Sequence, residues 1–436
     1  MAIERVFDDQ LGDWKRSCYC GEPRAEAVGR ELVLTGWVHT RRDHGGLIFV
    51  DLRDRSGITQ IVFNPEVDLN AHERAKQLRS EDVIAVRGVL SRRPAETLNP
   101  DLATGEVELA GKELRLLNAS QPPPFLIDDE SDANENTRLK YRYLDLRRPR
   151  SLAHLLLRYR MTKLIRDYLD VHGFIDIETP VLTKSTPEGA RDYLVPSRIY
   201  KGKFYALPQS PQLFKQILMV GGLDRYFQIV KCFRDEDLRA DRQPEFTQLD
   251  MEMSFTQADD VIGIVEGMMV LLFRELKGID IARPFQRLAW DEAMSRFGSD
   301  KPDMRFGLEL RDFTDALRDS QFKVFAAAVA KGGVVKGIRI PKGAELSRKD
   351  LDDMTPFVAT FGAKGIAWTR IADEGWQSPI AKFLTEAEKK EIERIAQAQL
   401  GDIILSSADT PRTVCDALGN LRLYLGEKFD LIRQNE

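Results

Sequence analysis

The chain has 436 residues, of which 43% are hydrophobic and 31% are charged, a composition that excludes collagen-like, low-complexity and wholly disordered proteins. At roughly 150 residues per domain, this length predicts about three domains. The net charge of -5 gives no overall basic excess, so any contact with nucleic acid must come from local basic patches.

The sequence has no apolar run of the roughly 20 residues that a membrane-spanning helix needs. Its N-terminus also lacks the apolar stretch of a secretory signal. The four cysteines are too scattered for a disulfide framework, and the C-x-C spacing of Cys18 and Cys20 does not match a zinc site. We therefore expect a cytoplasmic protein with small, buried cysteines and no metal held by its side chains.

Residues 31–117 predict a small β-barrel. Five short runs alternate apolar and polar residues, with turn residues between them: LVLTGWV, GLIFVDLRD, GITQIVF, DVIAVRGVL and EVELAGKELRLL. A short helix is expected at residues 71–78, between the third and fourth runs. This order favours a five-stranded oligonucleotide-binding barrel over a sandwich, and we place this domain at residues 1–118.

A linker is predicted at residues 119–150, because three consecutive prolines precede an acidic stretch with little to bury. After it, Ser151 is expected to cap a helix whose apolar residues recur at helical spacing. The run FIDIETPVL then predicts a strand. Pro180 within that run favours a position at the edge of a sheet.

The runs RYFQIVKCF and FTQLDMEMSF flank a highly charged segment, which predicts a long hairpin with a charged tip. A charged tip in isolation is equally explained as solvated surface. Residues 302–405 carry strand and helix patterns of their own, including a helix over 347–361 and a capping box formed by Thr385 and Glu388. They predict a separate α+β domain, followed by a further strand and a helix from Thr410.

Several segments match a known family. They are KYRYLDLRR, TPEGARDYLVPSR, LPQSPQLFKQ and ADRQPEFTQLDMEMSF. The segment YLDVHGFIDIETP has the form of class II motif 1, and Phe233, Arg234, Glu236 and Phe246 have the form of motif 2. On these residues the chain resembles the bacterial-type aspartyl-tRNA synthetases, which are class II aminoacyl-tRNA synthetases, over essentially its whole length.

The resemblance implies a multidomain α+β protein. Its parts are an anticodon-binding OB-fold barrel at 1–118, a hinge at 119–150, an antiparallel-sheet catalytic domain at 151–301 and an insertion domain at 302–405, with residues 406–436 starting the return to the catalytic domain. The implied reaction is that of an aspartate–tRNA ligase, which uses ATP and Mg²⁺ to form aspartyl-adenylate and then charges tRNA(Asp). Whether tRNA(Asn) is also charged stays open. A homodimer formed through motif 1 is expected.

The resemblance also assigns roles at the catalytic site. Arg234 is the expected catalytic residue, since a guanidinium can hold both the ATP α-phosphate and the carboxylate of aspartate. Glu188 is expected to meet the ammonium group of aspartate, while Gln212 and Lys215 line its pocket, with Lys215 as the specificity residue. Further contacts with ATP are implied for Asp235, Glu236, Gln243 and Phe246.

On the barrel, Phe49 and Gln60 match the positions that stack on and read an anticodon base, as recognition of single-stranded RNA requires. The alternative for Phe49 is a place in the barrel core. Arg41 and Arg42 are expected to contact phosphates. His44, in the loop HTRRDHGG, resembles the group of synthetases with relaxed tRNA specificity.

The chain departs from the family at its C-terminal end. Class II enzymes have a third motif, a Gly-rich strand and helix with an arginine that clamps the ATP γ-phosphate, and residues 255–436 contain no such segment. We therefore expect a C-terminally incomplete catalytic domain and very little activity from the chain alone, because several transition-state contacts are lost together. The alternative function is a catalytically inactive, truncated synthetase that retains tRNA binding.

Overall fold

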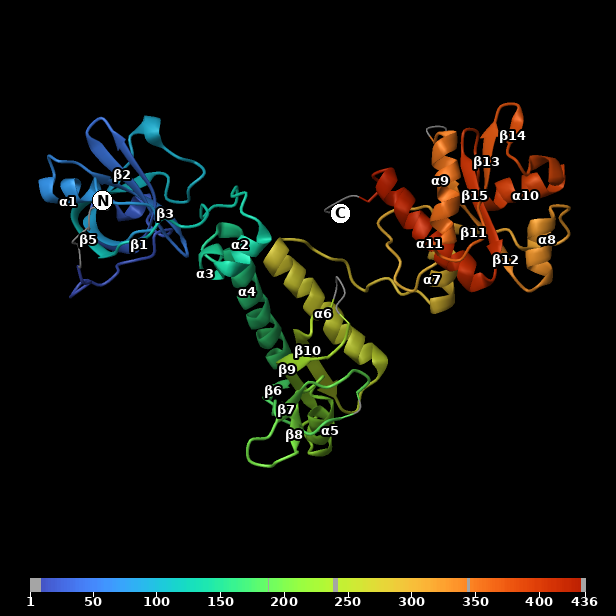
Figure 1. Cartoon of the computed structure of the whole chain (residues 1–436), viewed down its shortest axis with the longest axis horizontal. Coiled ribbons are helices and arrows are strands. Elements are labelled where there is room, and N and C mark those ends of the chain that lie inside the picture. Colours follow the sequence, from blue (N-terminus) through green and yellow to red (C-terminus); the bar gives the residue numbers. More distant parts are fainter. Residues whose placement is uncertain (1–8, 187, 238–241, 343–345, 433–436) are drawn as a thin grey trace. The chain divides into compact units, whose positions relative to one another are not determined.

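The computed structural model describes residues 9–186, 188–237, 242–342 and 346–432. The chain divides into two compact units, Met1–Arg283 and Pro284–Glu436, whose elements are labelled in Figure 1. In the described ranges, no helix combines the length and apolar composition that crossing a membrane requires.

Five strands close into a barrel in the first unit, which confirms the predicted OB-fold barrel. They are β1 (Glu31–His44), β2 (Leu47–Asp54), β3 (Gly57–Phe63), β4 (Val83–Arg92) and β5 (Val107–Asn118), in the order β1-β2-β3-β5-β4. Side chains alternate across a strand, so Ile48, Val50 and Leu52 of β2 all point into the barrel and are fully buried.

Helix α1 (Leu69–Ala75) lies between β3 and β4, as expected. It begins and ends earlier than the predicted range of 71–78, because Asp68 caps it by accepting a hydrogen bond from the Ala71 backbone at 2.6 Å. Two short 3-10 helices also flank barrel strands, η1 (Ala25–Ala27) and η2 (Ala95–Thr97).

The segment between the barrel and the next long helix is more ordered than a plain linker. It forms α2 (Glu135–Lys140) and α3 (Arg142–Asp145), and Phe125, Ile127 and Leu144 make a small buried cluster. Arg147 attaches it to the barrel, donating from Nη1 to Glu81 Oε2 at 2.8 Å. The sequence pattern therefore predicted less helix and less buried apolar surface in this segment than the structure contains.

The rest of the first unit is a helix-flanked antiparallel hairpin. Its elements are α4 (Pro149–Val171), β6 (Ile175–Asp176), β7 (Leu194–Pro196), β8 (Phe204–Ala206), α5 (Gln212–Val220), β9 (Arg225–Phe233), β10 (Glu245–Met253) and α6 (Ala258–Lys277). Strands β9 and β10 pair from Phe233 and Glu245 to Arg225 and Met253, which confirms the hairpin. Helices α4 and α6 contribute Leu169 and Met268 to its core.

Two details of this region differ from the predictions. Ser151 does not cap α4: Arg148 is the N-cap residue and Pro149 occupies the first turn, where a missing N–H costs nothing. The Ser151 hydroxyl instead donates to Asp145 at 3.2 Å. Of the predicted strand around Pro180, only Ile175–Asp176 pairs, as β6, and it does lie at the sheet edge, parallel to β9.

The second unit is a five-stranded sheet with helices. Its elements are α7 (Trp290–Phe297), β11 (Leu310–Asp312), η3 (Asp315–Leu317), α8 (Lys323–Ala330), β12 (Val334–Ile340), α9 (Arg348–Ala359), β13 (Ala367–Ala372), β14 (Gly375–Gln377), η5 (Ala381–Phe383), α10 (Glu386–Ala396), β15 (Ile403–Asp409) and α11 (Pro411–Lys428). The strand order is β11-β12-β15-β13-β14. Ser347 caps α9, and the Thr385–Glu388 capping box opens α10 as predicted.

Strand β15 and helix α11 complete this second unit, contrary to the prediction that residues 406–436 return to the catalytic sheet. Strand β15 lies between β12 and β13, and Leu418 and Leu421 of α11 are fully buried in the core beside it. The predicted boundary between residues 405 and 406 falls inside β15. The unit also begins at Pro284 rather than near residue 302, since α7 packs its Gly298 against Gly419 of α11.

Candidate functional sites

Lys215 lies beside the hairpin with two carboxylates around its ammonium group. Nζ donates to Asp250 Oδ1 at 3.0 Å and lies 3.3 Å from Glu252 Oε2. Burial disfavours the charged lysine, but the hydrogen bonds and charges of both carboxylates outweigh burial and raise the pKa of Lys215. Two carboxylates face one ammonium, so the cluster keeps a net negative charge that favours a second cationic group.

Glu188 is held in a fixed orientation near these groups. Its two carboxylate oxygens accept from Ser210 Oγ at 2.8 Å and from Thr186 Oγ1 at 3.0 Å. Its charge contributes, after burial itself, to raising the pKa of Asp250. Glu188 thus adds, together with Glu252, to the negative potential at Asp250.

Gln212 is the first residue of α5 and precedes Lys215 by three positions. Residues three apart share one face of a helix, so Gln212 and Lys215 lie on the same side of α5. Both side chains are half-buried. The helix geometry is compatible with a shared pocket for them.

Arg234 follows β9 and stacks on the hairpin. Its guanidinium carbon lies 5.1 Å from the ring centre of Phe246 on β10, a distance that suits a cation–π contact. Its Nε is buried and has no hydrogen-bond partner among the described residues. A half-buried guanidinium with one unsatisfied N–H group is suited to donate to a phosphate or carboxylate oxygen.

The remaining predicted ATP contacts lie at the hairpin tip. The Asp235 backbone N donates to the Arg191 carbonyl at 3.0 Å, and Glu236 pairs with Arg242 at 2.6 Å. Gln243 is exposed beside them. Residues 238–241 of the predicted charged tip lie outside the described residues.

Sequence reasoning missed the residues that hold this site together. Gln209 is 2% exposed, accepts from the Ala190 backbone at 3.0 Å and donates to Asp192 at 2.5 Å, so it docks the segment that carries Glu188. Asp250, the partner of Lys215, was also missed. The available signal was their position inside matched motifs, LPQSPQLFKQ and FTQLDMEMSF.

A hollow of about 620 Å³ lies on the outer face of the barrel. It is lined by Arg42, Asp43, His44, Phe49, Asp51, Gln60, Arg93, Thr97, Leu98, Asn99 and Leu102. Phe49 sits between the inward-facing residues Ile48 and Val50, so it faces outward and is not part of the barrel core. The alternative place for Phe49, in the core, is therefore wrong.

Pairing of the strands brings most of the predicted anticodon residues together. Arg42 pairs with Phe49, and Asp51 with Gln60. Arg42 donates to Gln60 Oε1 at 3.2 Å, and Gln60 donates onward to Glu108 at 2.8 Å. Arg41 does not join them: it lies on the opposite face of β1, and it does not line the hollow.

Arg93 also lines the hollow and was not among the predicted contacts. It is 7% exposed and donates from Nε to the Val107 carbonyl at 3.0 Å, but Nη2 is buried without a hydrogen-bond partner in the described structure. Burial lowers the pKa of Arg93. The sequence signal was the basic pair Arg92–Arg93.

Comparison with known proteins shows which family this architecture belongs to. Residues 134–401 match the family model for tRNA synthetases class II (D, K and N), and residues 32–117 match the model for the OB-fold nucleic acid binding domain. The chain belongs to the class II tRNA synthetases. It is 56% identical over 429 residues to the aspartate–tRNA(Asp/Asn) ligase of Syntrophotalea carbinolica, covering 98% of this chain and 72% of that protein.

A second relative, the aspartate–tRNA(Asp/Asn) ligase of Moorella thermoacetica, is 57% identical over 426 residues, covering 98% of this chain and 71% of that protein. Among solved structures, the chain is similar to asparaginyl-tRNA synthetase from Pyrococcus horikoshii complexed with asparaginyl-adenylate. The TM-score is 0.55 at 19% identity, covering 93% of this chain and 95% of the other. This structural likeness supports the class II synthetase fold.

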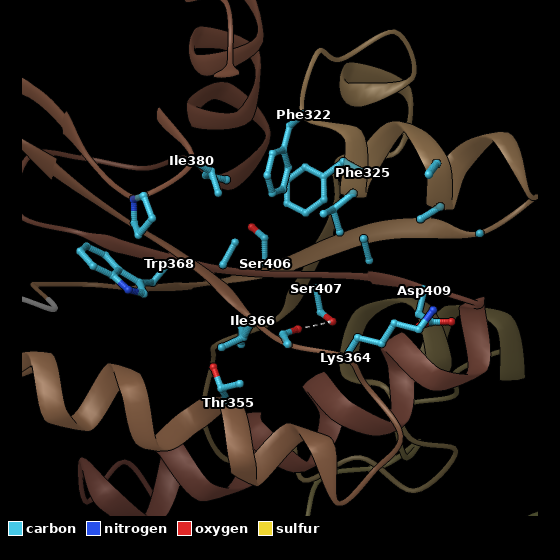
Figure 2. A pocket seen from close by; sticks show the side chains of 18 of the residues that line it. Phe322, Phe325, Thr355, Lys364, Ile366, Trp368, Ile380, Ser406, Ser407 and Asp409 are labelled. Carbon is cyan, nitrogen blue, oxygen red and sulfur yellow. Dashed lines mark hydrogen bonds and ion pairs between the residues drawn. The ribbon is translucent and has the colours of Figure 1, made fainter. Parts of the chain in front are cut away.

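The synthetase chain has a more apolar hollow in its second unit. Figure 2 shows Phe322 and Phe325 on one side of strand β15 and Thr355 on the other, with Trp368 and Lys364 nearby. The volume of this hollow is about 680 Å³. No residue with a predicted role in catalysis or tRNA binding lines it.

The cysteines of the synthetase chain carry no recognisable chemistry. All four are free; Cys20, Cys232 and Cys415 are buried, as predicted, and Cys18 is half-buried. Burial raises the pKa of the Cys232 thiol to about 11, so it is unreactive near neutral pH.

Proposed function

We propose that this chain is an aspartate–tRNA ligase, which joins L-aspartate to the 3′ end of tRNA(Asp) through aspartyl-adenylate. The observation that carries the proposal is the charged Lys215 beside Asp250 and Glu252, within a chain of the class II synthetase family. The relatives named aspartate–tRNA(Asp/Asn) ligase support it, and they do not favour the inactive tRNA-binding alternative.

Each charged group has a role in binding aspartate. The Lys215 ammonium pairs with the side-chain carboxylate of the substrate, which distinguishes aspartate from neutral asparagine. Glu188 and the carboxylate excess around Lys215 receive the substrate ammonium. Gln212, on the same face of α5, completes the pocket by hydrogen bonding.

Arg234 holds the reacting groups together. Its planar guanidinium contacts the ATP α-phosphate and the α-carboxylate of aspartate, so that a carboxylate oxygen attacks the α-phosphorus and pyrophosphate leaves. Phe246 packs against the Arg234 guanidinium and offers an aromatic surface to adenine. Asp235, Glu236 and Gln243 make further contacts with ATP. A terminal ribose hydroxyl of the tRNA then attacks the acyl carbon, and AMP leaves.

The reaction also needs Mg²⁺. In the described parts of the chain, no three or more His, Cys, Asp or Glu side chains gather as a metal site. Mg²⁺ is usually bound through substrate phosphates and water with few protein ligands, so here it would be held mainly by the phosphates of ATP and would offset their negative charge.

The barrel hollow is the proposed anticodon site. Phe49 stacks on a base, Gln60 reads its edge, and Arg42 and Arg93 supply positive charge beside it. His44 lies at the rim, where it can affect the choice between tRNA(Asp) and tRNA(Asn). Arg41, on the other face of β1, serves only as a contact for more distant phosphates.

We further propose a cytoplasmic homodimer, since ATP and tRNA are cytoplasmic substrates. Helix α4, which belongs to motif 1, exposes Leu155 and Tyr159 at 48% and 63%. Exposed apolar side chains on a motif 1 helix are suited to a two-fold interface. A molar mass in solution of twice the 49.7 kDa chain is expected, and a monomer at micromolar concentration would contradict the proposal.

Charging of tRNA transcripts tests the proposed function. With labelled aspartate, we expect tRNA(Asp) to be charged, tRNA(Asn) to be charged as a second substrate, and tRNA(Lys) to remain uncharged. Charging of tRNA(Asp) but not of tRNA(Asn) would contradict the proposed role of His44 in relaxed tRNA specificity. Binding of tRNA(Asp) without any charging would instead favour the inactive tRNA-binding protein.

A further inference from the structure

The turn between β1 and β2 carries His44 to the barrel hollow and has little of its own to hold it. His44 and Leu47 form the last pair of the hairpin, and Gly45 and Gly46 connect them with φ of 61° and 80°. Positive φ at both positions favours Gly-Gly. No atom beyond the neighbouring residues lies within 4 Å of where a Cβ of either glycine would be, so the side-chain side of this turn faces open space.

One distant side chain anchors this turn. His72 of α1 contacts the Gly46 carbonyl through Nε2 at 2.9 Å. His72 is 4% exposed, and its helix neighbours Ala71 and Ala75 belong to the barrel core. The helix that carries His72 is therefore packed on the barrel core, and the hydrogen bond ties the turn to that core.

The chemistry of the contact assigns the histidine tautomer. A carbonyl only accepts hydrogen bonds, so the Nε2 of His72 carries the proton. Nδ1 is buried without a hydrogen-bond partner in the described structure, with Glu73 Oε1 at 3.7 Å. Burying such a polar atom is unfavourable, so the imidazole at this position is better explained by its bond to Gly46 than by core packing.

We propose that His72 is a positioning residue for tRNA recognition: its hydrogen bond to Gly46 fixes the β1–β2 turn and so places His44 at the hollow assigned to the anticodon. This inference rests on the proposed function of the barrel. His72 does not itself line the hollow, and therefore acts through the turn. Without the bond, the glycine turn samples more conformations, and RNA binding must bear the cost of ordering it.

Binding of anticodon stem-loops to the full chain tests this role. We expect His72→Leu to weaken binding of the tRNA(Asp) stem-loop about three- to tenfold, the scale of one hydrogen bond. We also expect it to shift the ratio of affinities for the tRNA(Asp) and tRNA(Asn) stem-loops towards the ratio measured for His44→Ala. His72→Gln, whose amide can donate to Gly46, should restore both quantities.

His172→Leu is the matched control. His172 also contacts a backbone carbonyl, that of Tyr168 at 2.7 Å through Nδ1, but it lies at the end of α4, outside the barrel. This substitution should leave both affinities unchanged. All measurements are made below the melting transition of each variant, so that unfolding does not contribute.

A double-mutant cycle separates positioning from general stability. If His72 acts through His44, His72→Leu has a smaller effect in the His44→Ala background. Equal effects in both backgrounds, or unchanged affinities in His72→Leu, would overturn the inference. If the unmodified chain binds neither stem-loop, the proposed function itself is wrong. If the unmodified chain binds and His72→Leu leaves both affinities unchanged, only the proposed role of His72 is wrong.

Discussion

At the scale of single residues, each candidate site contains an arginine with one buried N–H group that has no hydrogen-bond partner in the described structure. Arg234 has an unsatisfied Nε beside Phe246, and Arg93 has an unsatisfied Nη2 beside Phe49 and Gln60. Buried donors are normally satisfied within the protein. These two unsatisfied donors lie where a phosphate, carboxylate or base is expected to bind, whereas a third, Nε of Arg370, lies in the second unit away from both candidate sites.

Arg93 gives a prediction at this scale. Replacing it by methionine removes the buried donor and should weaken binding of the tRNA(Asp) anticodon stem-loop by about 1–3 kcal/mol, the range of a good base contact. Arg92→Met is the control, because Arg92 is exposed and does not line the hollow. Fluorescence anisotropy measures both, and equal affinities for the two variants would argue against a role for Arg93.

The salt dependence of the same binding shows what Arg93 contacts. If it meets a base edge, Arg93→Met weakens binding without changing the slope of log affinity against log salt. If it meets a phosphate, the slope falls by about 0.7, the value for one neutralised charge on a single strand. We expect the first result, because the guanidinium is buried beside Phe49 and Gln60 rather than at the rim.

At the scale of elements, helix α11 is fixed to the second unit by a buried arginine. Arg422 is 1% exposed and donates to the backbone carbonyls of Asp303, Phe306 and Gly307 at 2.7–3.0 Å. Its guanidinium also lies 4.0 Å from the ring centre of Phe306. The arginine thus satisfies the polar groups of the loop between α7 and β11.

Arg422→Met should therefore destabilise the second unit by about 2–4 kcal/mol, since it leaves three carbonyls without their charged donor. Arg412→Met, on the same helix, should change the unfolding free energy by less than about 0.5 kcal/mol, because Arg412 is 91% exposed in its side chain. Urea unfolding followed by tryptophan fluorescence measures both. Similar values for the two variants would contradict this account of α11.

Local sequence signals predicted most individual elements. Alternation in GLIFVDLRD identified β2, and the Thr385–Glu388 capping box located the start of α10. The sequence signals failed where pairing with a strand distant in sequence determines the structure. Within the predicted strand 174–182, only Ile175 and Asp176 pair with another strand. Strand β15 pairs with β12 and β13 rather than with the catalytic sheet, a pairing that no local pattern contains.

The sites show the same division. The family resemblance proposed roles for Lys215, Glu188, Arg234, Phe49 and Gln60, but it did not predict which residues surround them. Asp250 and Arg93 matter through contacts made in three dimensions, and Arg41 was grouped with Arg42 although adjacent strand residues face opposite sides. The sequence therefore proposes which residues act, but it does not contain the three-dimensional contacts around them.

At the scale of the whole molecule, two features must occur in one chain: a pocket selective for aspartate and a barrel selective for an anticodon. The residues proposed for both lie in the first unit, Met1–Arg283. The OB-fold model matches residues 32–117 within that unit, and the class II synthetase model matches residues 134–401, which extend into the second unit. The central claim is the choice of amino acid, because it alone distinguishes an aspartate ligase from the other synthetases of the D, K and N family.

Amino-acid-dependent exchange of pyrophosphate with ATP tests this claim most directly. We expect exchange above background with L-aspartate, and none with L-asparagine or L-lysine, because Lys215 needs a carboxylate and repels an ammonium. The readout is selectivity, so a low overall rate does not weaken it. Lys215→Met should abolish the preference for aspartate; exchange that is equal or greater with asparagine or lysine in the unmodified chain would contradict the account.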